Sequence, residues 1–169
     1  MIQKKVCMVG VFGTGKTSLV QQYVHSIFSV KYHSTVGVKI DRKTVAVDGQ
    51  EVSLVLWDLA GKAADQEISP SYLRGAHGVL YVVDGTRKET LEELPSIQAL
   101  VRDTAGAIPG LVALNKADLE SEWRLTAADE AGLKGQGWEV LRTSAKTGAA
   151  VEQAFGWLAR ETLKPGATA

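Results

Sequence analysis

This 169-residue chain has little cysteine, only one residue, and no formal net charge. Its one cysteine excludes an internal disulfide and a cysteine-based zinc site, and the apolar run around Cys7 predicts a small buried hydrophobe there. The histidines His25, His33 and His77 lack the spacing of metal ligands. A formal net charge of zero, without a basic run, argues against nucleic acid as a partner and against bulk attraction to an anionic membrane.

Long apolar stretches are missing too. No run approaches the roughly 18–20 residues that a membrane-spanning helix needs, and the sequence starts directly on a predicted strand, which leaves no room for a signal peptide. Residues 164–169 carry neither a prenylation cysteine nor a polybasic segment. We therefore expect a cytoplasmic chain without a lipid anchor, and the charged helix faces favour a monomer.

What is present is an alternation of apolar runs and amphipathic segments over one domain, residues 1–169. Residues 39–47 and 51–57 predict a β-hairpin around Asp48-Gly49, because Asp-Gly supplies the positive φ values of a tight turn. Further strands are predicted at 6–9, 78–83, 111–114 and 139–142.

Helices are predicted at 18–24, 90–104, 126–134 and 150–163. Pro95 either opens a new helical turn or marks a kink, and Thr126 is a candidate N-cap. The pattern predicts an α/β fold with a six-stranded, mostly parallel sheet, one antiparallel hairpin strand and helices on both faces. In such sheets, ligands bind at the carboxyl ends of the strands.

Residues 10–17, Gly-Val-Phe-Gly-Thr-Gly-Lys-Thr, fit the phosphate-binding loop G-x-x-x-x-G-K-[ST] between a predicted strand and helix. Glycines let the backbone approach phosphates closely, and several N–H groups converge at the helix N-terminus. Lys16 would bridge the β- and γ-phosphates, and the Thr17 hydroxyl would ligate Mg²⁺. The pattern therefore predicts a P-loop that binds a nucleotide.

Two acidic motifs follow other strands. Asp58 would hold Mg²⁺, and the N–H of Gly61 could turn to a γ-phosphate. In Asn115-Lys116-Ala117-Asp118, the Asp118 carboxylate can accept two hydrogen bonds from guanine, an arrangement that adenine does not offer. Asp118 therefore favours guanine and argues against an ATPase or kinase.

The remaining base contacts are predicted around these motifs. Lys116 would lie over the base, and Asn115 would tie the loops together. In Ser144-Ala145-Lys146, the Ala145 N–H would meet guanine O6 and Lys146 would cover the base.

In this order, the motifs resemble the Ras-like small GTPases over about residues 4–164, and residues 34–38, 57–58 and 72–78 resemble the Rab branch. The resemblance implies a P-loop NTPase fold and a molecular switch that binds GTP and GDP with Mg²⁺ and hydrolyses GTP. Thr35 would complete the Mg²⁺ shell, Phe28 would pack against the base, and Tyr32 would lie over the phosphates. A GTP-state effector would bind residues 30–40 and 60–74, and an exchange factor and an activating protein are implied as further partners.

The predicted site gathers these residues. The nucleotide contacts are Gly13, Thr14, Gly15, Lys16, Thr17, Ser18, Phe28, Tyr32, Thr35, Asp58, Gly61, Asn115, Lys116, Asp118, Ser144, Ala145 and Lys146. The predicted metal ligands are Thr17, Thr35 and Asp58, and the catalytic candidates are Lys16, Thr35, Gly61 and Lys62.

Three features depart from the family pattern. Lys62 replaces the glutamine that orients the attacking water, and a lysine cannot accept a hydrogen bond from that water, so slow hydrolysis is expected. Its side chain would point either into solvent or to the γ-phosphate.

Phe12 replaces a very small residue, so its ring either faces the γ-phosphate or packs on residues 60–74. The missing prenylation cysteine indicates either a truncated chain or a protein that works without an anchor. The alternative function is a hydrolysis-deficient GTP-binding interaction module.

Overall fold

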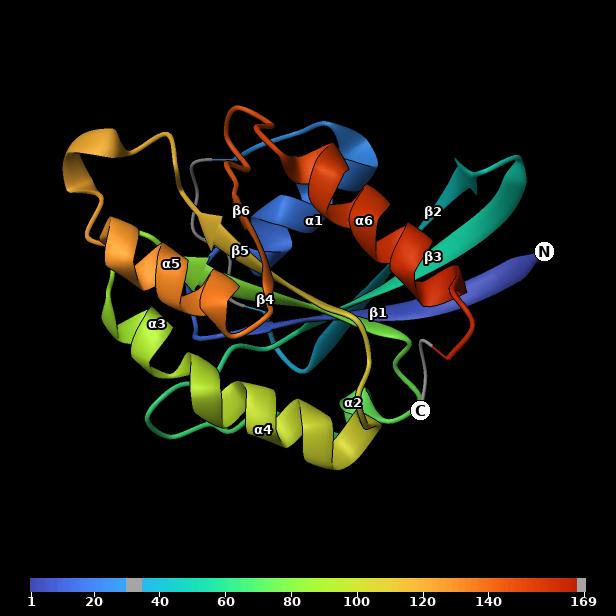
Figure 1. The fold of residues 1–169 in the computed structure, drawn as a ribbon, viewed down its shortest axis with the longest axis horizontal. Helices are drawn as coiled ribbons and strands as arrows, with labels where there is room; N and C mark the ends of the chain where they lie inside the picture. Colours follow the sequence, from blue (N-terminus) through green and yellow to red (C-terminus); the bar gives the residue numbers. More distant parts are fainter. Residues whose placement is uncertain (30–34, 167–169) are drawn as a thin grey trace.

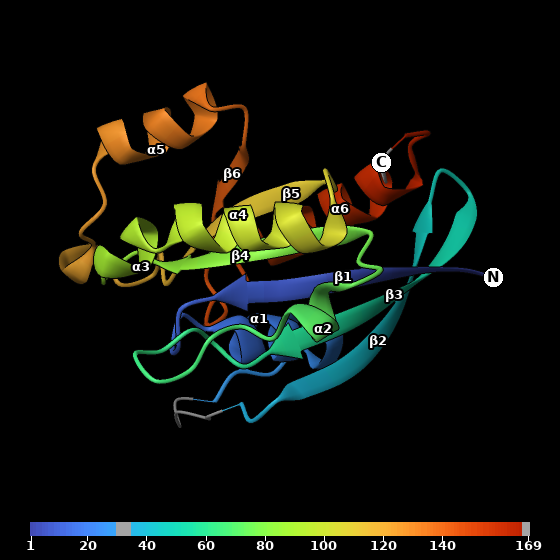
Figure 2. The same ribbon diagram turned by 90° about the horizontal axis from the view of Figure 1, so that it is seen from below.

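A six-stranded sheet forms the centre of the computed structural model, which describes residues 1–29 and 35–166 (Figure 1). Its strands are β1 (Ile2–Gly10), β2 (Val38–Val47), β3 (Gln50–Leu59), β4 (Gly78–Asp84), β5 (Gly110–Asn115) and β6 (Glu139–Arg142). Their order across the sheet is β2-β3-β1-β4-β5-β6, as Figure 2 shows. Only β2 and β3 pair antiparallel among these strands, so the predicted fold class is confirmed.

The hairpin between β2 and β3 turns where the sequence predicts. Asp48 has φ 51° and Gly49 has φ 80°, and Val47 pairs with Gln50 across the turn. Two successive residues with positive φ match the right-handed twist of the paired strands. In this register, β3 ends with Asp58 and Leu59, at the edge of the sheet where the site lies.

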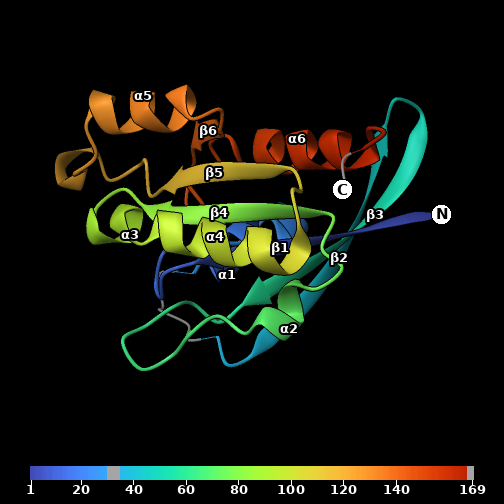
Figure 3. The same cartoon turned by 60° about the horizontal axis from the view of Figure 1, so that its bottom comes forward.

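Helices cover both faces of the sheet. Figure 1 shows α1 (Lys16–His25) and α6 (Val151–Leu163) above it, with α2 (Pro70–Leu73), α3 (Glu89–Glu92) and α4 (Leu94–Ala105) below. In Figure 3, α4 runs along β4 directly after α3, and α5 (Ala127–Gly135) lies beyond, near β6. The described helices include none long and apolar enough to cross a membrane.

Two hydrophobic clusters fill the layers between helices and sheet. Successive strand residues face opposite ways, so Val6 and Met8 of β1 pack toward α1 and α6, and Cys7 and Val9 pack toward α2, α4 and α5. Cys7 is fully buried, as predicted, and burial raises the pKa of its thiol to about 12. Burial on both faces explains why the central strands read as continuous apolar runs.

The helix boundaries show which of the two alternatives for Pro95, a new helical turn or a kink, is correct. The proline lies in the first turn of α4, directly after the separate short helix α3, so it opens a helix and does not kink one. Thr126 caps α5 as predicted, with its hydroxyl accepting from the Asp129 N–H and the Asp129 carboxylate accepting from the Thr126 N–H. Two short elements, α2 and a 3₁₀ turn at Glu120–Glu122, were not predicted.

Candidate functional site

A cavity of about 350 Å³ lies at the carboxyl edge of the parallel strands. Its wall is formed by segments that follow β1, β3, β5 and β6 and by the residues after α1. The lining residues are Phe12, Gly13, Gly15, Lys16, Thr17, Ser18, Phe28, Ser29, Thr35, Gly61, Asn115, Lys116, Asp118, Leu119, Ala145 and Lys146. Most of the predicted nucleotide contacts therefore share one cavity.

The P-loop wraps the N-terminus of α1. Gly15 has φ 101°, and a Cβ on it would lie 2.3 Å from Asn115 Nδ2, so only glycine fits. Lys16 is 5% exposed, and its Nζ donates to the Val11 carbonyl at 3.0 Å. Burial lowers the pKa of Lys16 to about 8; the charge of Asp58 opposes this shift and that of Arg87 adds to it. A nearly buried ammonium at a helix N-terminus is suited to bind an anion.

Asn115, the last residue of β5, and Lys116, which follows it, bind carbonyl groups of the P-loop. The Asn115 side chain, 1% exposed, donates from Nδ2 to the Thr14 carbonyl at 3.0 Å. Lys116 Nζ donates to the Gly13 carbonyl at 3.1 Å. Asn115 therefore ties two loops together in this structure, as expected from the sequence.

The predicted metal ligands lie together. Thr17 Oγ1 donates to Asp58 Oδ2 at 2.6 Å and lies 2.6 Å from Thr35 Oγ1. Asp58 is fully buried, and its Oδ1 has no hydrogen-bond partner among the described residues. Burial raises the pKa of the Asp58 carboxyl, and the Thr17 hydrogen bond and the charges of Lys16 and Lys39 act against that shift. Two hydroxyls and a carboxylate with an unpartnered oxygen are hard oxygen donors, which fit Mg²⁺.

The far end of the cavity carries the predicted base contacts. Ser144 Oγ donates to Asp118 Oδ1 at 2.7 Å and also accepts from the Thr147 N–H at 3.1 Å. This contact fixes one oxygen of the Asp118 carboxylate, while the residue itself lines the cavity. Ala145 and Lys146 follow Ser144 and line the same end.

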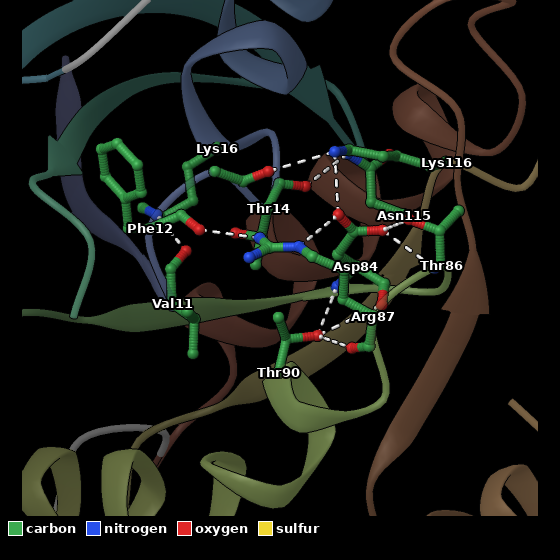
Figure 4. Close-up of polar contacts among 11 residues, drawn as sticks. Val11, Phe12, Thr14, Lys16, Asp84, Thr86, Arg87, Thr90, Asn115 and Lys116 are labelled. Carbon is green, nitrogen blue, oxygen red and sulfur yellow. Dashed lines mark hydrogen bonds and ion pairs between the residues drawn. The ribbon is translucent and has the colours of Figure 1, made fainter. Parts of the chain in front are cut away.

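The outcome at the aromatic positions is mixed. Phe12 and Phe28 both line the cavity, with 42% and 39% of their surfaces exposed. Figure 4 shows the Phe12 ring on the opposite side of the loop from Arg87. Tyr32 lies outside the described residues.

Lys62 takes neither of the two expected directions. Its backbone pairs with the P-loop, because its N–H donates to the Gly10 carbonyl and its carbonyl accepts from the Phe12 N–H, both at 2.9 Å. From there its ammonium reaches Glu93 Oε2 at 2.8 Å and Ser96 Oγ at 3.2 Å. The hydrogen bond to Glu93 raises the pKa of Lys62, with the nearby negative charges adding to the effect and desolvation opposing it. In this placement Lys62 does not line the cavity, and its catalytic role stays a prediction.

Asp84 and Arg87 also lie beside the P-loop, although no sequence motif contains them (Figure 4). Asp84 ends β4, and its buried carboxylate contacts Lys116 Nζ at 2.8 Å and Arg87 Nε at 3.0 Å. Its position gave a signal: like Asp58 and Asn115, it is a polar residue at the carboxyl end of a buried strand. Arg87 gave none, since its contact with the P-loop joins segments far apart in the sequence.

Comparison with known proteins points the same way. The sequence profile of the Ras family matches residues 5–164. The chain is similar to the Ras-related protein Rab-1 of Theileria parva, with 34% identity over 92% of this chain and 72% of the relative. It is also similar to the Ras-related protein Rab-13 of Canis lupus familiaris, with 32% identity over 94% of this chain and 79% of the relative.

Proposed function

This chain belongs to the Ras family of small GTPases, on its Rab branch, and from that premise we propose that it binds GTP and GDP with Mg²⁺ and changes conformation between them. Members of the family are GTP-binding molecular switches that hydrolyse GTP. The observation that carries the proposal is that Lys16, Thr17 and Asp118 line one cavity, and that the Thr17 hydroxyl donates to the buried Asp58 carboxylate.

Asp118 selects guanine. Ser144 holds one carboxylate oxygen, which leaves lone pairs on the carboxylate to accept from guanine N1–H and its exocyclic amine. Adenine lacks this pair of donors, and a buried acceptor without its donor costs binding free energy. The site therefore prefers guanine over adenine nucleotides.

Lys16 and the P-loop N–H groups neutralise the phosphates. Thr17, Thr35 and Asp58 would hold Mg²⁺, which supplies positive charge against the phosphate oxygens when it is bound. Thr35 precedes β2 and reaches Thr17 from residues 30–40, so its contact links that segment to the phosphate end of the cavity.

Displacement of a fluorescent GDP analogue by unlabelled GDP, GTP and ATP, with Mg²⁺ present, tests the proposal. We expect GDP and GTP to displace the probe at least about a hundredfold more effectively than ATP. Equal displacement by ATP would contradict guanine selection. Failure of the fluorescent GDP analogue to bind at all would contradict nucleotide binding altogether.

Hydrolysis is slow because Lys62 does not orient water. Its ammonium is bound to Glu93 and Ser96, on the side of α3 and α4, and it has no acceptor for the proton of an attacking water. The same observation favours the second candidate function, a GTP-binding interaction module with no useful hydrolysis.

Single-turnover hydrolysis of preloaded GTP separates these alternatives. We expect a nearly inert parent, a gain of at least about tenfold in Lys62→Gln, where an amide can orient water, and no change in Glu93→Ala. An increase in Glu93→Ala would identify the released Lys62 as catalytic and contradict the proposal. Equal inertness of the parent and Lys62→Gln would favour the interaction module.

The partners follow from the family. Ras and Rab proteins act with effectors, exchange factors and activating proteins in general. In this chain, an effector specific for the GTP state binds residues 30–40 and 60–74, where Val36 is 89% exposed and Ile40 is 47% exposed. We further propose that the protein acts as a monomer in the cytoplasm, and its formal net charge of zero argues against a nucleic-acid partner.

A further inference from the structure

Arg87 lies on a rigid turn between β4 and α3. The Asp84 carboxylate closes this turn, because its Oδ1 accepts from the Thr86 N–H at 2.9 Å and from the Thr86 hydroxyl at 2.6 Å. The Arg87 N–H donates to the Asp84 carbonyl at 3.0 Å. From the first turn of α3, the buried Thr90 hydroxyl donates to the Arg87 carbonyl at 2.7 Å. The backbone of Arg87 is therefore fixed on both sides.

Trp123 holds the same turn from outside. Gly85 is fully packed against it: a Cβ on Gly85 would lie 1.9 Å from the indole ring. The Arg124 N–H also donates to the Gly85 carbonyl at 2.8 Å. The turn is thus clamped between the indole and α3, so that the Arg87 side chain starts from a defined position.

From this turn the Arg87 guanidinium bridges Asp84 and the P-loop. Its Nε donates to Asp84 Oδ2 at 3.0 Å, and its Nη2 donates to the Phe12 carbonyl at 2.7 Å (Figure 4). Asp84 is fully buried and also binds Lys116 at 2.8 Å. A planar guanidinium can make both contacts at once, in a way that a lysine ammonium on a flexible stem cannot.

Side-chain donors bind the carbonyl groups of three successive P-loop residues. Arg87 binds the Phe12 carbonyl, Lys116 binds the Gly13 carbonyl and Asn115 binds the Thr14 carbonyl. In a planar trans peptide, the C=O and the following N–H point in opposite directions. The contact at the Phe12 carbonyl therefore directs the Gly13 N–H away from Arg87, and Gly13 lines the cavity.

We propose that Arg87 is a positioning residue for the phosphate chain, acting through the Phe12–Gly13 peptide. Its hydrogen bond fixes the tilt of that peptide and polarises it, which makes the Gly13 N–H a stronger donor to a β- or γ-phosphate. The guanidinium also adds positive charge beside Lys16. This inference rests on the proposed binding of GTP and GDP, and it adds a residue that the sequence motifs do not contain.

The ligand series GTP, GDP and GMP tests this role, because GMP lacks the β- and γ-phosphates. Displacement titrations with Mg²⁺ would compare the parent with Arg87→Met, Arg87→Lys and the control Arg160→Met, an exposed arginine of α6. We expect Arg87→Met to bind GTP and GDP about tenfold more weakly and GMP less than twofold more weakly. Arg87→Lys should fall between parent and Arg87→Met, and Arg160→Met should equal the parent.

A spectroscopic readout follows the peptide itself. In the GDP complex, the Gly13 amide proton of Arg87→Met should move upfield relative to the parent, because a weaker hydrogen bond deshields the proton less. A structural role alone would lower GMP and GDP affinity equally, and that result would overturn the proposal, as would an unmoved Gly13 signal in either Arg87 variant. A parent that binds no GDP would contradict the proposed function and this inference together. If the parent binds GDP tightly but Arg87→Met lowers GDP and GMP affinity by the same factor, this inference alone would be contradicted.

Discussion

At the scale of single residues, the proposed function assigns the choice of base to Asp118. Replacing it by Asn keeps an oxygen for the Ser144 hydroxyl but places an NH₂ donor where guanine also presents donors. We expect Asp118→Asn to lose GDP affinity by a factor on the order of 10²–10⁴ and to gain affinity for xanthosine diphosphate, whose base offers an acceptor there. Displacement titrations with the two diphosphates measure this change, and an unchanged GDP affinity would contradict the assignment.

At the same scale, Asp84 makes the free energy of unfolding depend on pH. Burial raises the pKa of its carboxyl, but hydrogen bonds from Lys116, Thr86 and Arg87 together outweigh that effect, so the pKa lies below its ordinary value of 3.8. The unfolded chain therefore binds more protons between the two pKa values, and the stabilisation by Asp84 is complete above 3.8 and lost as the pH falls through the lower, folded value.

We therefore expect Asp84→Asn to be less stable than the parent at about pH 6, with the difference narrowing below about pH 4. The neutral amide cannot neutralise Lys116 and Arg87, whereas acid removes the same negative charge from the parent. Urea unfolding across this pH range, at a fixed nucleotide concentration, measures the difference. A difference that stays constant with pH would show that the charge of Asp84 does not stabilise the fold.

At the scale of elements, the turn between β4 and α3 depends on the close contact of Gly85 with Trp123. A Cβ at Gly85 would force the indole to move, so Gly85→Ala should lower the free energy of unfolding by about 1–3 kcal/mol. Gly132→Ala is the matched control, because a Cβ at this position on α5 meets nothing within 4 Å. It should raise stability by about 0.5–1 kcal/mol, the helix preference of alanine over glycine. Equal effects of the two variants in urea unfolding would contradict the packing argument.

The elements also show what sequence can and cannot predict. The hairpin at Asp48-Gly49, the cap at Thr126 and the strands were predicted because turn chemistry, capping and alternation are local signals. The helix α2 spans only Pro70–Leu73, too short for a periodic pattern. The direction of Lys62 depends on Glu93 in α3–α4, and the role of Arg87 depends on a loop far away in the chain, so neither follows from spacing.

At the scale of the whole molecule, the sheet brings distant motifs to one edge. The parallel order aligns the carboxyl ends of β1, β3, β5 and β6, where Asp58 and Asn115 lie at the ends of their strands and the P-loop and Ser144 come after theirs. The P-loop, Asp58 and Asn115 could be found in the sequence because each stands directly after an apolar run. Residues 30–40 and 60–74 meet this edge through Thr35 and Gly61, so a γ-phosphate would contact both segments at once.

A molecular switch requires that the nucleotide state change the conformation of this chain. Hydrogen–deuterium exchange of the GDP complex and of a complex with a non-hydrolysable GTP analogue, both with Mg²⁺, tests this claim directly. We expect slower exchange in residues 30–40 and 60–74 of the GTP-analogue complex, with exchange in the sheet unchanged. Equal exchange of both segments in the two complexes would contradict a nucleotide-dependent switch.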